Sequence, residues 1–264
     1  MPPKRPSLTD RPAGAWPPGV ACCVLEQVDS TNAEAMRRAS GLTGPTWIMA
    51  RWQTAGRGRR GRAWTDPPGN FAATLLLHPQ GGPAAAARYS FVAALAVHDA
   101  LRALCGPHPV LALKWPNDVL LNGGKLSGIL LEGVGSGASI QALAIGIGIN
   151  LLTAPGSLSL EPDALHPVSL LGETGLTVTP DEMLPALAMA FAEWQARMEA
   201  EGFEPIRRAW LARAARLGDT ITARSGATRT TGRFEGIDDS GALVLTGPRG
   251  RQVIPAADIF FTGA

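Results

Sequence analysis

Short apolar runs bounded by turn residues fill most of the first half of the chain. Their lengths predict strands. Five separate strands are predicted, over Val20–Val28, Thr46–Trp52, Asn70–Leu77, Val110–Lys114 and Gln141–Leu151. A further pair, Asp118–Leu121 and Leu126–Gly133, flanks Asn122-Gly123-Gly124-Lys125, a composition typical of a hairpin turn.

Helices are predicted in four segments. Thr31 and Glu34 have the spacing of a capping box, so a helix should begin here and continue through Ser40. Its first turn would present free backbone N–H groups. The other three helices are predicted over Ala84–Leu104, Pro180–Glu199 and Pro205–Leu217, and Pro155–Pro167 is expected to be a loop.

The composition changes near residue 216, which predicts a domain boundary. From Gly218 onward, short β runs alternate with turns such as Asp-Asp-Ser-Gly, which is typical of a small barrel-like β domain. At the other end, residues 1–18 are rich in Pro and contain no apolar core of a signal peptide, which predicts a disordered arm. The expected division is an arm (1–18), a main domain (19–216) and a small β domain (217–264).

Composition narrows the class of protein. Apolar residues make up 45% of the chain and charged residues 17%, which favours a folded globular protein. The net charge of +2 is too small to imply a nucleic-acid partner by itself, and no apolar stretch predicts a membrane span. Cys22, Cys23 and Cys105 show neither zinc-site spacing nor a disulfide pattern, which fits a reducing, cytoplasmic setting.

Positive charge is concentrated in a glycine-spaced arginine loop, Gly56-Arg57-Gly58-Arg59-Arg60-Gly61-Arg62. The glycines allow the backbone to approach a ligand closely, and the arginine side chains match carboxylate and phosphate oxygens. A solvated basic loop or a nucleic-acid patch is the simpler alternative. Trp64 could belong to the core or cover a purine ring, and Gln53 could merely satisfy its own backbone.

Lysine is rare: of 24 basic side chains, three are lysines, namely Lys4, Lys114 and Lys125. Retention of lysine in a chain that otherwise uses arginine suggests a local requirement for a compact ammonium group. Lys114 begins Lys-Trp-Pro-Asn-Asp, in which Pro116 makes a stiff bend. Alternatively, Asn117 and Asp118 only build a turn, and Lys125 is an exposed hairpin lysine.

Two further polar positions have a plain structural alternative. Ser30, Thr31 and Asn32 could act as a helix cap, or could supply hydroxyl and amide groups to a neutral polar ligand. Asn150 ends an apolar strand, where a turn role is the default. Gly146 and Gly148 in the same strand mark a close approach of a ligand or another backbone.

Taken in order, these motifs resemble those of the biotin protein ligases. The matching segments are Asp-Ser-Thr-Asn at 29–32, Gln53 with Gly-Arg-Gly-Arg-Arg-Gly-Arg-Ala-Trp at 56–64, Lys-Trp-Pro-Asn-Asp at 114–118, Gly-Lys-Leu-Ser-Gly-Ile-Leu at 124–130 and Gly-Ile-Gly-Ile-Asn at 146–150. Gly-Ile-Asp-Asp-Ser-Gly-Ala-Leu at 236–243 resembles part of the family's C-terminal module. The resemblance covers residues 20 to 264.

The resemblance implies an α+β fold: a biotin/lipoate ligase-type catalytic domain with a mixed β-sheet backed by helices, followed by a small SH3-like β-barrel. It also implies a two-step reaction. Biotin and MgATP give biotinyl-5′-AMP and pyrophosphate, and the biotinyl group then passes to one lysine of a biotin carboxyl carrier protein domain. Two-function members carry an N-terminal DNA-binding winged helix, and only a Pro-rich arm is expected here, so operator binding is not expected.

The resemblance also assigns site residues. Arg59 and Lys125 are expected to be catalytic, at the biotin carboxylate and the α-phosphate. The biotin-binding set is Ser30, Thr31, Asn32, Gln53, Arg57, Gly58, Arg59, Lys125 and Gly128. The set for ATP and the adenylate is Arg57, Arg59, Arg60, Arg62, Trp64, Lys114, Asn117, Lys125 and Asn150. Asp118 is expected to orient the acceptor lysine, and no protein metal ligand is expected.

Three rival functions remain open at this stage. A lipoate or octanoate ligase would use similar chemistry, a nucleic-acid-binding protein would use the Arg51 to Arg62 patch, and an inert carrier-binding adaptor would turn over no ATP. Residues 54–66 are expected to be mobile without ligand and ordered around the adenylate. The chain could be a monomer or a homodimer.

Overall fold

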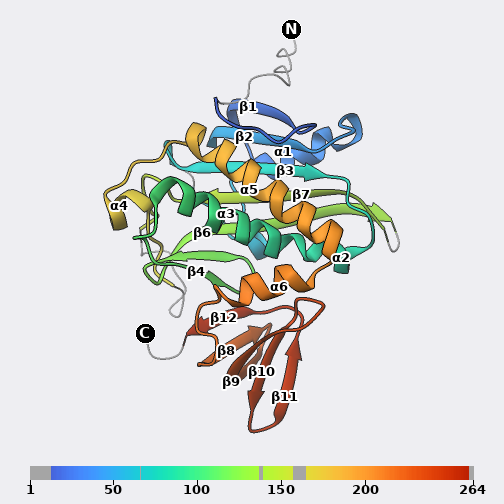
Figure 1. Cartoon of the computed structure of the whole chain (residues 1–264), viewed down its shortest axis with the longest axis vertical. Coiled ribbons are helices and arrows are strands. Elements are labelled where there is room, and N and C mark those ends of the chain that lie inside the picture. The colour runs from blue at the N-terminus through green and yellow to red at the C-terminus, as the bar shows by residue number, and fades with distance from the viewer. Residues whose placement is uncertain (1–12, 66, 137–138, 157–164, 262–264) are drawn as a thin grey trace.

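A computed structural model of the chain describes residues 13–65, 67–136, 139–156 and 165–261, and its centre is a seven-stranded sheet (Figure 1). The strand order is β1-β2-β3-β7-β6-β5-β4; β1 and β2 run parallel, and the other neighbours pair antiparallel. The strands are β1 (Ala21–Val28), β2 (Thr46–Gln53), β3 (Phe71–Leu77), β4 (Leu111–Lys114), β5 (Asp118–Leu121), β6 (Gly124–Ser136) and β7 (Ser139–Ile149).

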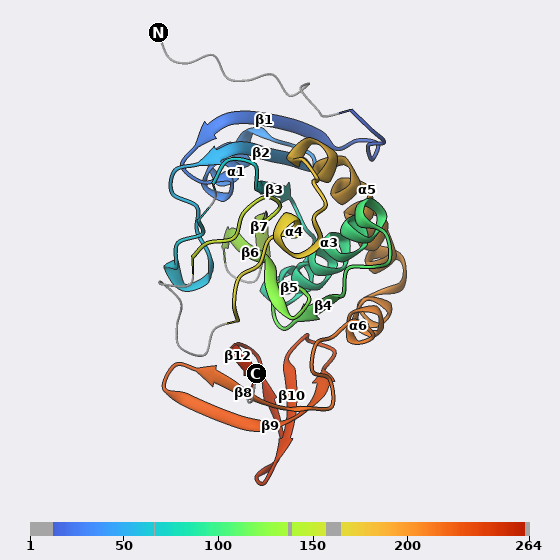
Figure 2. The same cartoon turned by 90° about the vertical axis from the view of Figure 1, so that its left-hand side faces the viewer.

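Helices cover both faces of this sheet. The long helices α3 (Tyr89–Cys105) and α5 (Pro180–Glu201) pack together on one face, and α1 (Thr31–Arg38) lies on the other, against β2, β3 and β7 (Figures 1 and 2). The remaining helical segments are α2 (Pro83–Ala87), α4 (Leu170–Thr174), α6 (Glu204–Leu211) and the short 3-10 turns η1 (Ala39–Gly41) and η2 (Arg59–Gly61). The predicted α+β class, with a mixed sheet backed by helices, is therefore confirmed.

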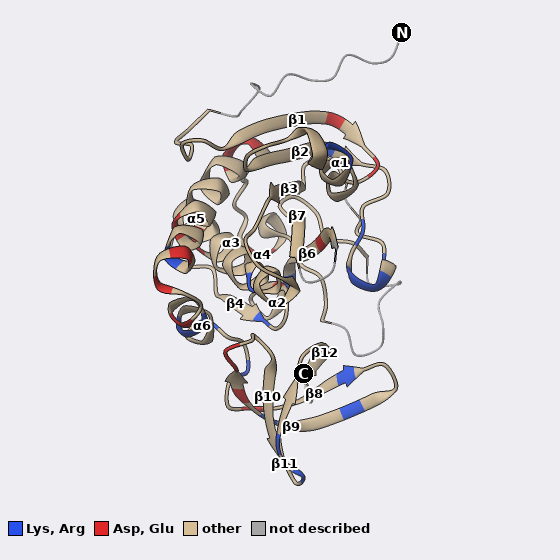
Figure 3. Ribbon diagram, turned by 90° about the vertical axis from the view of Figure 1, so that its right-hand side faces the viewer, with Lys and Arg blue, Asp and Glu red and all other residues tan. Residues whose placement is uncertain are grey.

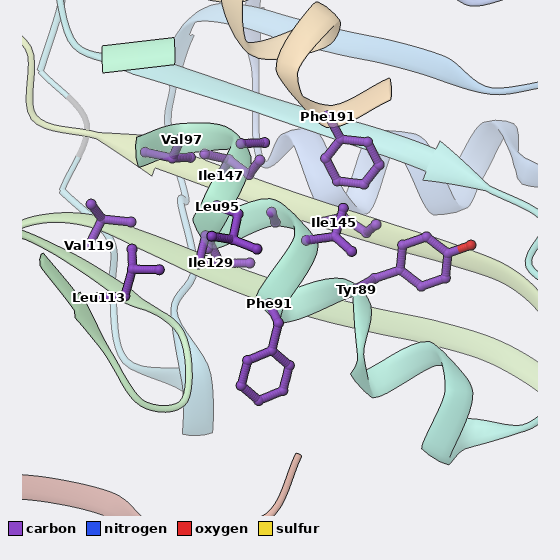
Figure 4. Packing of buried hydrophobic residues seen from close by; sticks show 14 of the residues in the cluster. Tyr89, Phe91, Leu95, Val97, Leu113, Val119, Ile129, Ile145, Ile147 and Phe191 are labelled. Carbon is purple, nitrogen blue, oxygen red and sulfur yellow. The ribbon is translucent and has the colours of Figure 1, made fainter. Parts of the chain in front are cut away.

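The main core lies between the sheet and the α3–α5 layer. Ile145 and Ile147 of β7 point toward Leu95 and Phe191 of this layer, as Figure 4 shows. Ala142 and Ala144 of the same strand belong to a smaller cluster on the α1 face, because successive side chains of a strand point to opposite faces. The same alternation separates Cys22 and Cys23, so both are buried, one in each cluster.

Two helix predictions were wrong in their bounds, and one helix was missed. The expected helix Ala84–Leu104 is two helices, α2 and α3, which meet at Arg88. The expected helix Pro205–Leu217 ends at Leu211, because the following residues pair with the edge strand β4: Leu113 N donates to Arg213 O at 2.8 Å, and Ala215 N donates to Leu113 O at 2.8 Å. The short helix α4 was not predicted.

The small C-terminal domain is a five-stranded antiparallel sheet with the order β11-β10-β9-β8-β12. Its strands are β8 (Thr220–Ser225), β9 (Thr228–Ile237), β10 (Leu243–Gly247), β11 (Gly250–Ile254) and β12 (Asp258–Phe261). It lies beside α6 and the β4 edge of the large sheet, with β12 nearest to that sheet (Figures 1 and 2). A β domain after residue 217 agrees with the composition change seen in the sequence.

A turn of the small domain docks directly onto the main core. The indole N–H of Trp115 donates to Gly241 O at 2.9 Å. Gly241 has φ of +86°, and a side-chain carbon added there would lie 2.6 Å from the Phe91 ring. The turn therefore requires glycine both for its backbone conformation and for its packing.

The prediction of a disordered arm over residues 1–18 falls mostly on residues 1–12, which lie outside the described residues. Within the rest of the arm, Trp16 packs against the main core and its indole N–H donates to Val20 O at 2.8 Å. This part of the arm therefore lies on the folded domain. None of the helices in the described ranges is long and apolar enough to cross a membrane.

Replacing Gly241 should separate the two requirements of the docking turn. Gly241→Ala combines an unfavourable positive φ with a clash against Phe91, so we expect a loss of about 2–4 kcal/mol in the free energy of unfolding. Gly250→Ala is the matched control, because Gly250 has φ of +81° and no atom within 4 Å of the added carbon. It should lose only about 1 kcal/mol. Equal losses in denaturant unfolding would contradict a packing role for Gly241.

Candidate active site

A cavity of about 420 Å³ lies on the sheet face that carries α1. Its walls come from the start of α1, the end of β2, the arginine loop, strands β5 to β7, and β12 of the small domain. Most of the residues predicted from the sequence line it: Ser30, Thr31, Asn32, Gln53, Arg57, Gly58, Arg59, Arg62, Trp64, Lys114, Asn117, Asp118, Lys125, Gly128 and Asn150. Arg60 is the exception, and its side chain pairs with the small domain instead.

One end of the cavity is formed by uncharged polar groups at the start of α1. Ser30 caps this helix, with its hydroxyl accepting from Ala33 N. The amide and hydroxyl of Thr31 donate to Gln53 Oε1 at 2.9 and 3.2 Å. Thr74 Oγ1 lies 2.8 Å from the Thr31 hydroxyl, which fixes it from below. This end offers oriented hydrogen-bonding groups that carry no charge.

Asn32 has a structural role beside this polar end. Its amide donates to Glu132 Oε2 at 2.8 Å and to Leu130 O at 3.3 Å, and its Oδ1 lies 2.6 Å from Thr74 Oγ1. Gly146 leaves room for it, since a side-chain carbon there would lie 2.3 Å from Asn32 Oδ1. The close approach expected at Gly146 is therefore explained by a side chain of α1.

The arginine loop is a small hairpin that crosses from β2 toward the small domain. Arg57 and Ala63 pair across it, Gly58 N donates to Arg62 O at 2.7 Å, and Trp64 N donates to Gly56 O at 2.9 Å. At its tip, Arg60 has a positive φ of 57°. Figure 3 shows this loop as the blue turn beside β6. The regular pairing within this loop was not predicted.

Each end of this hairpin contacts a carboxylate. At the base, Arg57 Nη2 lies 3.5 Å from Glu132 Oε1 on β6. At the tip, three guanidinium groups surround Asp258 at the start of β12, at 3.5 Å for Arg59, 2.7 Å for Arg60 and 3.4 Å for Arg62. Glu132 and Asp258 were both missed in the sequence, since neither lies in a recognisable motif.

Arg59 has the most buried side chain of the four loop arginines, with 24% of it exposed. It donates to Asn117 Oδ1 at 3.3 Å and to Ala257 O at 3.4 Å, so it joins the two domains. Burial lowers the pKa of Arg59, while Asp258 and Asp118 oppose that shift. An arginine remains charged through such a change, so Arg59 presents a partly desolvated cation to the cavity.

Trp64 lies on a floor made by glycines of β6 and β7. A side-chain carbon at Gly148 would lie 2.5 Å from its ring, and one at Gly128 would lie 3.1 Å from it. Lys125 Nζ lies 5.9 Å from the centre of the same ring. Trp64 therefore forms a flat apolar wall of the cavity, next to its main cation.

The charged centre of the site is Asp118 between two lysines. Lys125 Nζ lies 2.7 Å from Asp118 Oδ1, and Lys114 Nζ lies 3.5 Å from Asp118 Oδ2. Burial raises the pKa of Asp118, but the two ammonium groups outweigh it, and the pKa is held below its ordinary value. Burial lowers the pKa of Lys114, which Asp118 partly counteracts. The simpler reading of Lys125 as an exposed hairpin lysine is wrong.

Two asparagines complete the wall near this centre. Asn117 donates to Ile129 O at 2.6 Å while accepting from Arg59. Asn150 donates to Val168 O at 3.1 Å, and its Oδ1 is buried with no hydrogen-bond partner within the described ranges. A buried acceptor of this kind is costly unless a ligand satisfies it. Asn150 thus has more than a turn role.

Comparisons with known proteins agree with this arrangement. The "Biotin/lipoate A/B protein ligase family" matches residues 24–150, and the "Biotin protein ligase C terminal domain" matches residues 217–262. The chain is 63% identical to the biotin–[acetyl-CoA-carboxylase] ligase of Paracoccus denitrificans over 91% of this chain and 100% of that protein.

This chain belongs to the biotin protein ligase family. Solved structures of the family have the same fold. The ligase from Aquifex aeolicus, in complex with biotin and ATP, is 25% identical with a TM-score of 0.73. The match covers 90% of this chain and 97% of the Aquifex chain. The ligase from Leishmania major, in complex with biotinyl-5-AMP, is 26% identical with a TM-score of 0.55. The match covers 91% of this chain and 100% of the Leishmania chain.

Removing the charge of Asp118 should destabilise this ligase strongly. Asp118→Asn leaves the ammonium groups of Lys114 and Lys125 without their counter-charge, so we expect the free energy of unfolding at pH 7 to fall by about 3 kcal/mol. Asp219→Asn is the control, because Asp219 is half exposed and pairs at 3.4 Å with Arg216. It should change by less than about 1 kcal/mol.

The difference in the free energy of unfolding between wild type and Asp118→Asn should also depend on pH. Because the pKa of Asp118 is lowered by folding, its contribution is complete above about pH 4 and is lost as pH falls through the folded-state pKa. Denaturant unfolding from pH 7 down to acid should therefore show a constant difference that narrows only below about pH 4. A difference that narrows between pH 7 and 5 would contradict this assignment.

Proposed function

We propose that this biotin protein ligase activates biotin with ATP and transfers it to a lysine of a biotin carboxyl carrier protein domain. In the first step, one carboxylate oxygen of biotin attacks the α-phosphorus of ATP, forming biotinyl-5′-AMP as the bond to pyrophosphate breaks. In the second step, the acceptor amine attacks the acyl carbon and releases AMP. The observation that carries this proposal is the placement of Lys125, Lys114 and Arg59 around one cavity.

The first step brings two anions into contact, and the cations of the cavity would reduce the repulsion between them. Two unit charges ~4 Å apart repel by ~4 kcal/mol in a surface-like dielectric, and by more as water leaves. Cations that are fixed before the reaction offset this repulsion with little reorganisation. Lys125 is held by Asp118 and Arg59 is held by Asn117, and both cations line the cavity. We assign these two cations to the biotin carboxylate and the α-phosphate.

The polar end near α1 suits the ureido ring of biotin. Its carbonyl accepts hydrogen bonds and its two N–H groups donate them, and the ring carries no charge. Ser30, Thr31 and Gln53 supply hydroxyl and amide groups of both kinds there. A buried site that hydrogen-bonds a ligand in this way discriminates strongly against analogues without the matching groups. This favours biotin over lipoate or octanoate, which lack a ureido ring.

We assign the nucleotide to the half of the cavity toward the small domain. Arg57, Lys114 and the loop amides would hold phosphates, and Trp64 would pack near adenine. Asn117 and Asn150 would complete the polar wall, with the unpartnered Asn150 Oδ1 accepting from the nucleotide. Arg62 lines the same region, whereas Arg60 would act from the tip of the loop. The small domain would shape this side through β12.

Asp118 would serve the second step. Its lowered pKa keeps it ionised at neutral pH, so it can attract the ammonium group of an incoming lysine and orient the amine. Lys125 and Lys114 are paired with this carboxylate in the structure. The negative charge of the adenylate would also interact with these two ammonium groups, and so weaken their hold on Asp118. The acceptor lysine would come from the carrier domain of acetyl-CoA carboxylase or a related enzyme.

Magnesium would enter as the counter-ion of ATP. No group of three or more metal-binding side chains occurs within the described residues, and the carboxylates of the cavity are paired with lysines or arginines. Mg²⁺ commonly binds through substrate phosphates and keeps several waters, so this set of residues suits a metal carried by ATP. It would neutralise phosphate charge.

Several further assignments belong to the proposal. The catalytic unit would span residues 19–216 and the small domain residues 217–264. The spacing of Cys22, Cys23 and Cys105 fits no disulfide framework, which supports a reducing cytoplasmic setting. Neither operator DNA nor a membrane is a proposed partner. We propose the mobility of residues 54–66 without ligand as a further property of the enzyme, in a monomer or a homodimer.

The activity is tested by biotin-dependent exchange between ATP and labelled pyrophosphate. The purified protein should catalyse exchange with biotin and at least 100-fold less efficiently with lipoate, because lipoate leaves the polar end unpaired. It should then biotinylate an added carrier domain. Exchange that prefers lipoate would replace the proposal with the lipoate ligase reading, and no exchange with either acid would remove it.

Lys125 should be essential for adenylate formation. Lys125→Arg places a larger, forked cation beside Asp118 and Trp64, and we expect the exchange rate to fall by more than ~10-fold. The same substitution at Lys4, which precedes the described residues, is the matched control and should leave the rate unchanged. A near-normal rate for Lys125→Arg would remove Lys125 from the catalytic set.

A further inference from the structure

The backbone of Lys125 is held by residues 166–168, a segment that is distant from it in the sequence. Lys125 N donates to His166 O at 2.8 Å, and Val168 N donates to Lys125 O at 3.0 Å. Pro167 lies opposite Lys125 in this parallel bridge, at a position where no N–H is required of it. The lysine that the proposed function makes catalytic is thus fixed through its main chain as well as through its side chain.

Val168 also contacts Asn150. Its carbonyl accepts from Asn150 Nδ2 at 3.1 Å, and the buried Oδ1 of the same amide has no hydrogen-bond partner in the part of the chain that the structure describes. The main chain of Asn150 is fixed at the same time, because Leu170 N donates to Asn150 O at 2.8 Å and Asn150 N donates to Leu126 O at 2.9 Å. Val168 therefore connects two polar residues of the cavity wall, one through its N–H and the other through its carbonyl.

The side chain of Val168 lies against Gly124. A side-chain carbon at Gly124 would lie 2.3 Å from Val168 Cγ1 and 3.0 Å from Val168 Cγ2. Rotation about the Cα–Cβ bond of Val168 leaves at least one methyl group in one of these two positions, so the segment itself must move to make room. Gly124 has no positive φ, so its glycine is required for packing and not for backbone conformation.

We propose that Val168 is a positioning residue for adenylate formation: its backbone sets the place of Lys125 relative to Asn150, and its contact with Gly124 keeps it there. This inference rests on the proposed function, in which Lys125 acts at the α-phosphate and Asn150 accepts from the nucleotide. Both groups must then meet one ligand at once. A misplacement of about 1 Å can lower a rate by about 100-fold, so the distance between these two groups affects the chemical step.

Gly124→Ala tests the proposal by displacing Val168. The kcat of biotin-dependent pyrophosphate exchange should fall by roughly tenfold or more, and the KM for ATP should rise roughly threefold, because Lys125 and Asn150 are misplaced together. Gly41→Ala is the matched control, since the added carbon has no atom within 4 Å and Gly41 has no positive φ. Its kinetic constants should match those of wild type.

Val168→Ala should restore activity when it is combined with Gly124→Ala. It removes both methyl groups and keeps the backbone groups that contact Lys125 and Asn150. The remaining contact of the added carbon, 3.1 Å to His166 O, requires a shift of only a few tenths of an ångström. The kcat of the double variant should therefore return to within about threefold of wild type.

Val168→Gly is a second variant, and it adds no atom. Like Val168→Ala it removes the contact with Gly124, but it also loosens the backbone of the segment. Its kcat should therefore be roughly threefold lower than that of Val168→Ala. This comparison decides the proposal if Gly124→Ala does not fold.

Amide hydrogen exchange gives a readout that does not require catalysis. The amides of Lys125 and Val168 are the two donors of the bridge. Without substrates, their exchange should be roughly fivefold faster or more in Gly124→Ala than in wild type, and it should return toward the wild-type rate in the double variant. Gly41→Ala should leave both amides unchanged.

Three results would overturn the proposal. If the amides of Lys125 and Val168 exchange faster in Gly124→Ala while kcat is unchanged, the segment has only a structural role. If both readouts are unchanged, or if the double variant does not recover kcat, the contact between Val168 and Gly124 does not position the site. Equal kcat values for Val168→Gly and Val168→Ala would do the same. Failure of the proposed function is distinguishable, since wild type would then catalyse no exchange with biotin while the amide exchange of the variants still differed.

Discussion

The site depends on a buried carboxylate that lies between two ammonium groups beside a cavity. Burial alone would lower the pKa values of lysines, and an isolated cation cannot be placed in an apolar wall without a large penalty. Asp118 supplies the counter-charge for Lys114 and Lys125 at once. The same carboxylate opposes the lowering of the pKa of Arg59 by burial. The cations are thus fixed in place before any anionic substrate arrives, which is what a reaction between two anions requires.

Antiparallel pairing explains how this centre is built from distant sequence positions. Lys114 at the end of β4 is the register partner of Asp118 at the start of β5, and Asp118 in turn lies opposite Gly128 on β6. A shift of register between Val119 and Leu120 then brings Lys125 to the same region. The glycines of β6 and β7 have no side chains, so the Trp64 ring can lie directly on the sheet. Sheet geometry, more than local turn chemistry, therefore sets the position of each charged group.

The sequence was informative where one residue type carries the chemistry by itself. The scarcity of lysine pointed to Lys114 and Lys125, and the glycine-spaced arginines pointed to the loop; both line the cavity. Periodicity gave the strands and the sheet-covering helices but missed the break at Arg88 and the early end of α6. That end is set by pairing with β4, a long-range contact without a local signal. Glu132 and Asp258 were missed for the same reason. The role of each carboxylate depends on a long-range contact with an arginine, and the sequence around it carries no signal of that contact.

The arginine loop connects two properties that are usually treated separately. Its side chains contact the small domain through Asp258 and also line the cavity that would hold the nucleotide. Any ligand that changes the position of these side chains must therefore change the contact between the domains, and the coupling free energy is the same in both directions. The small domain is thus linked to the cavity through one carboxylate at the tip of the loop. Its docking through Gly241 and Trp115 keeps that carboxylate at a fixed place relative to the catalytic sheet.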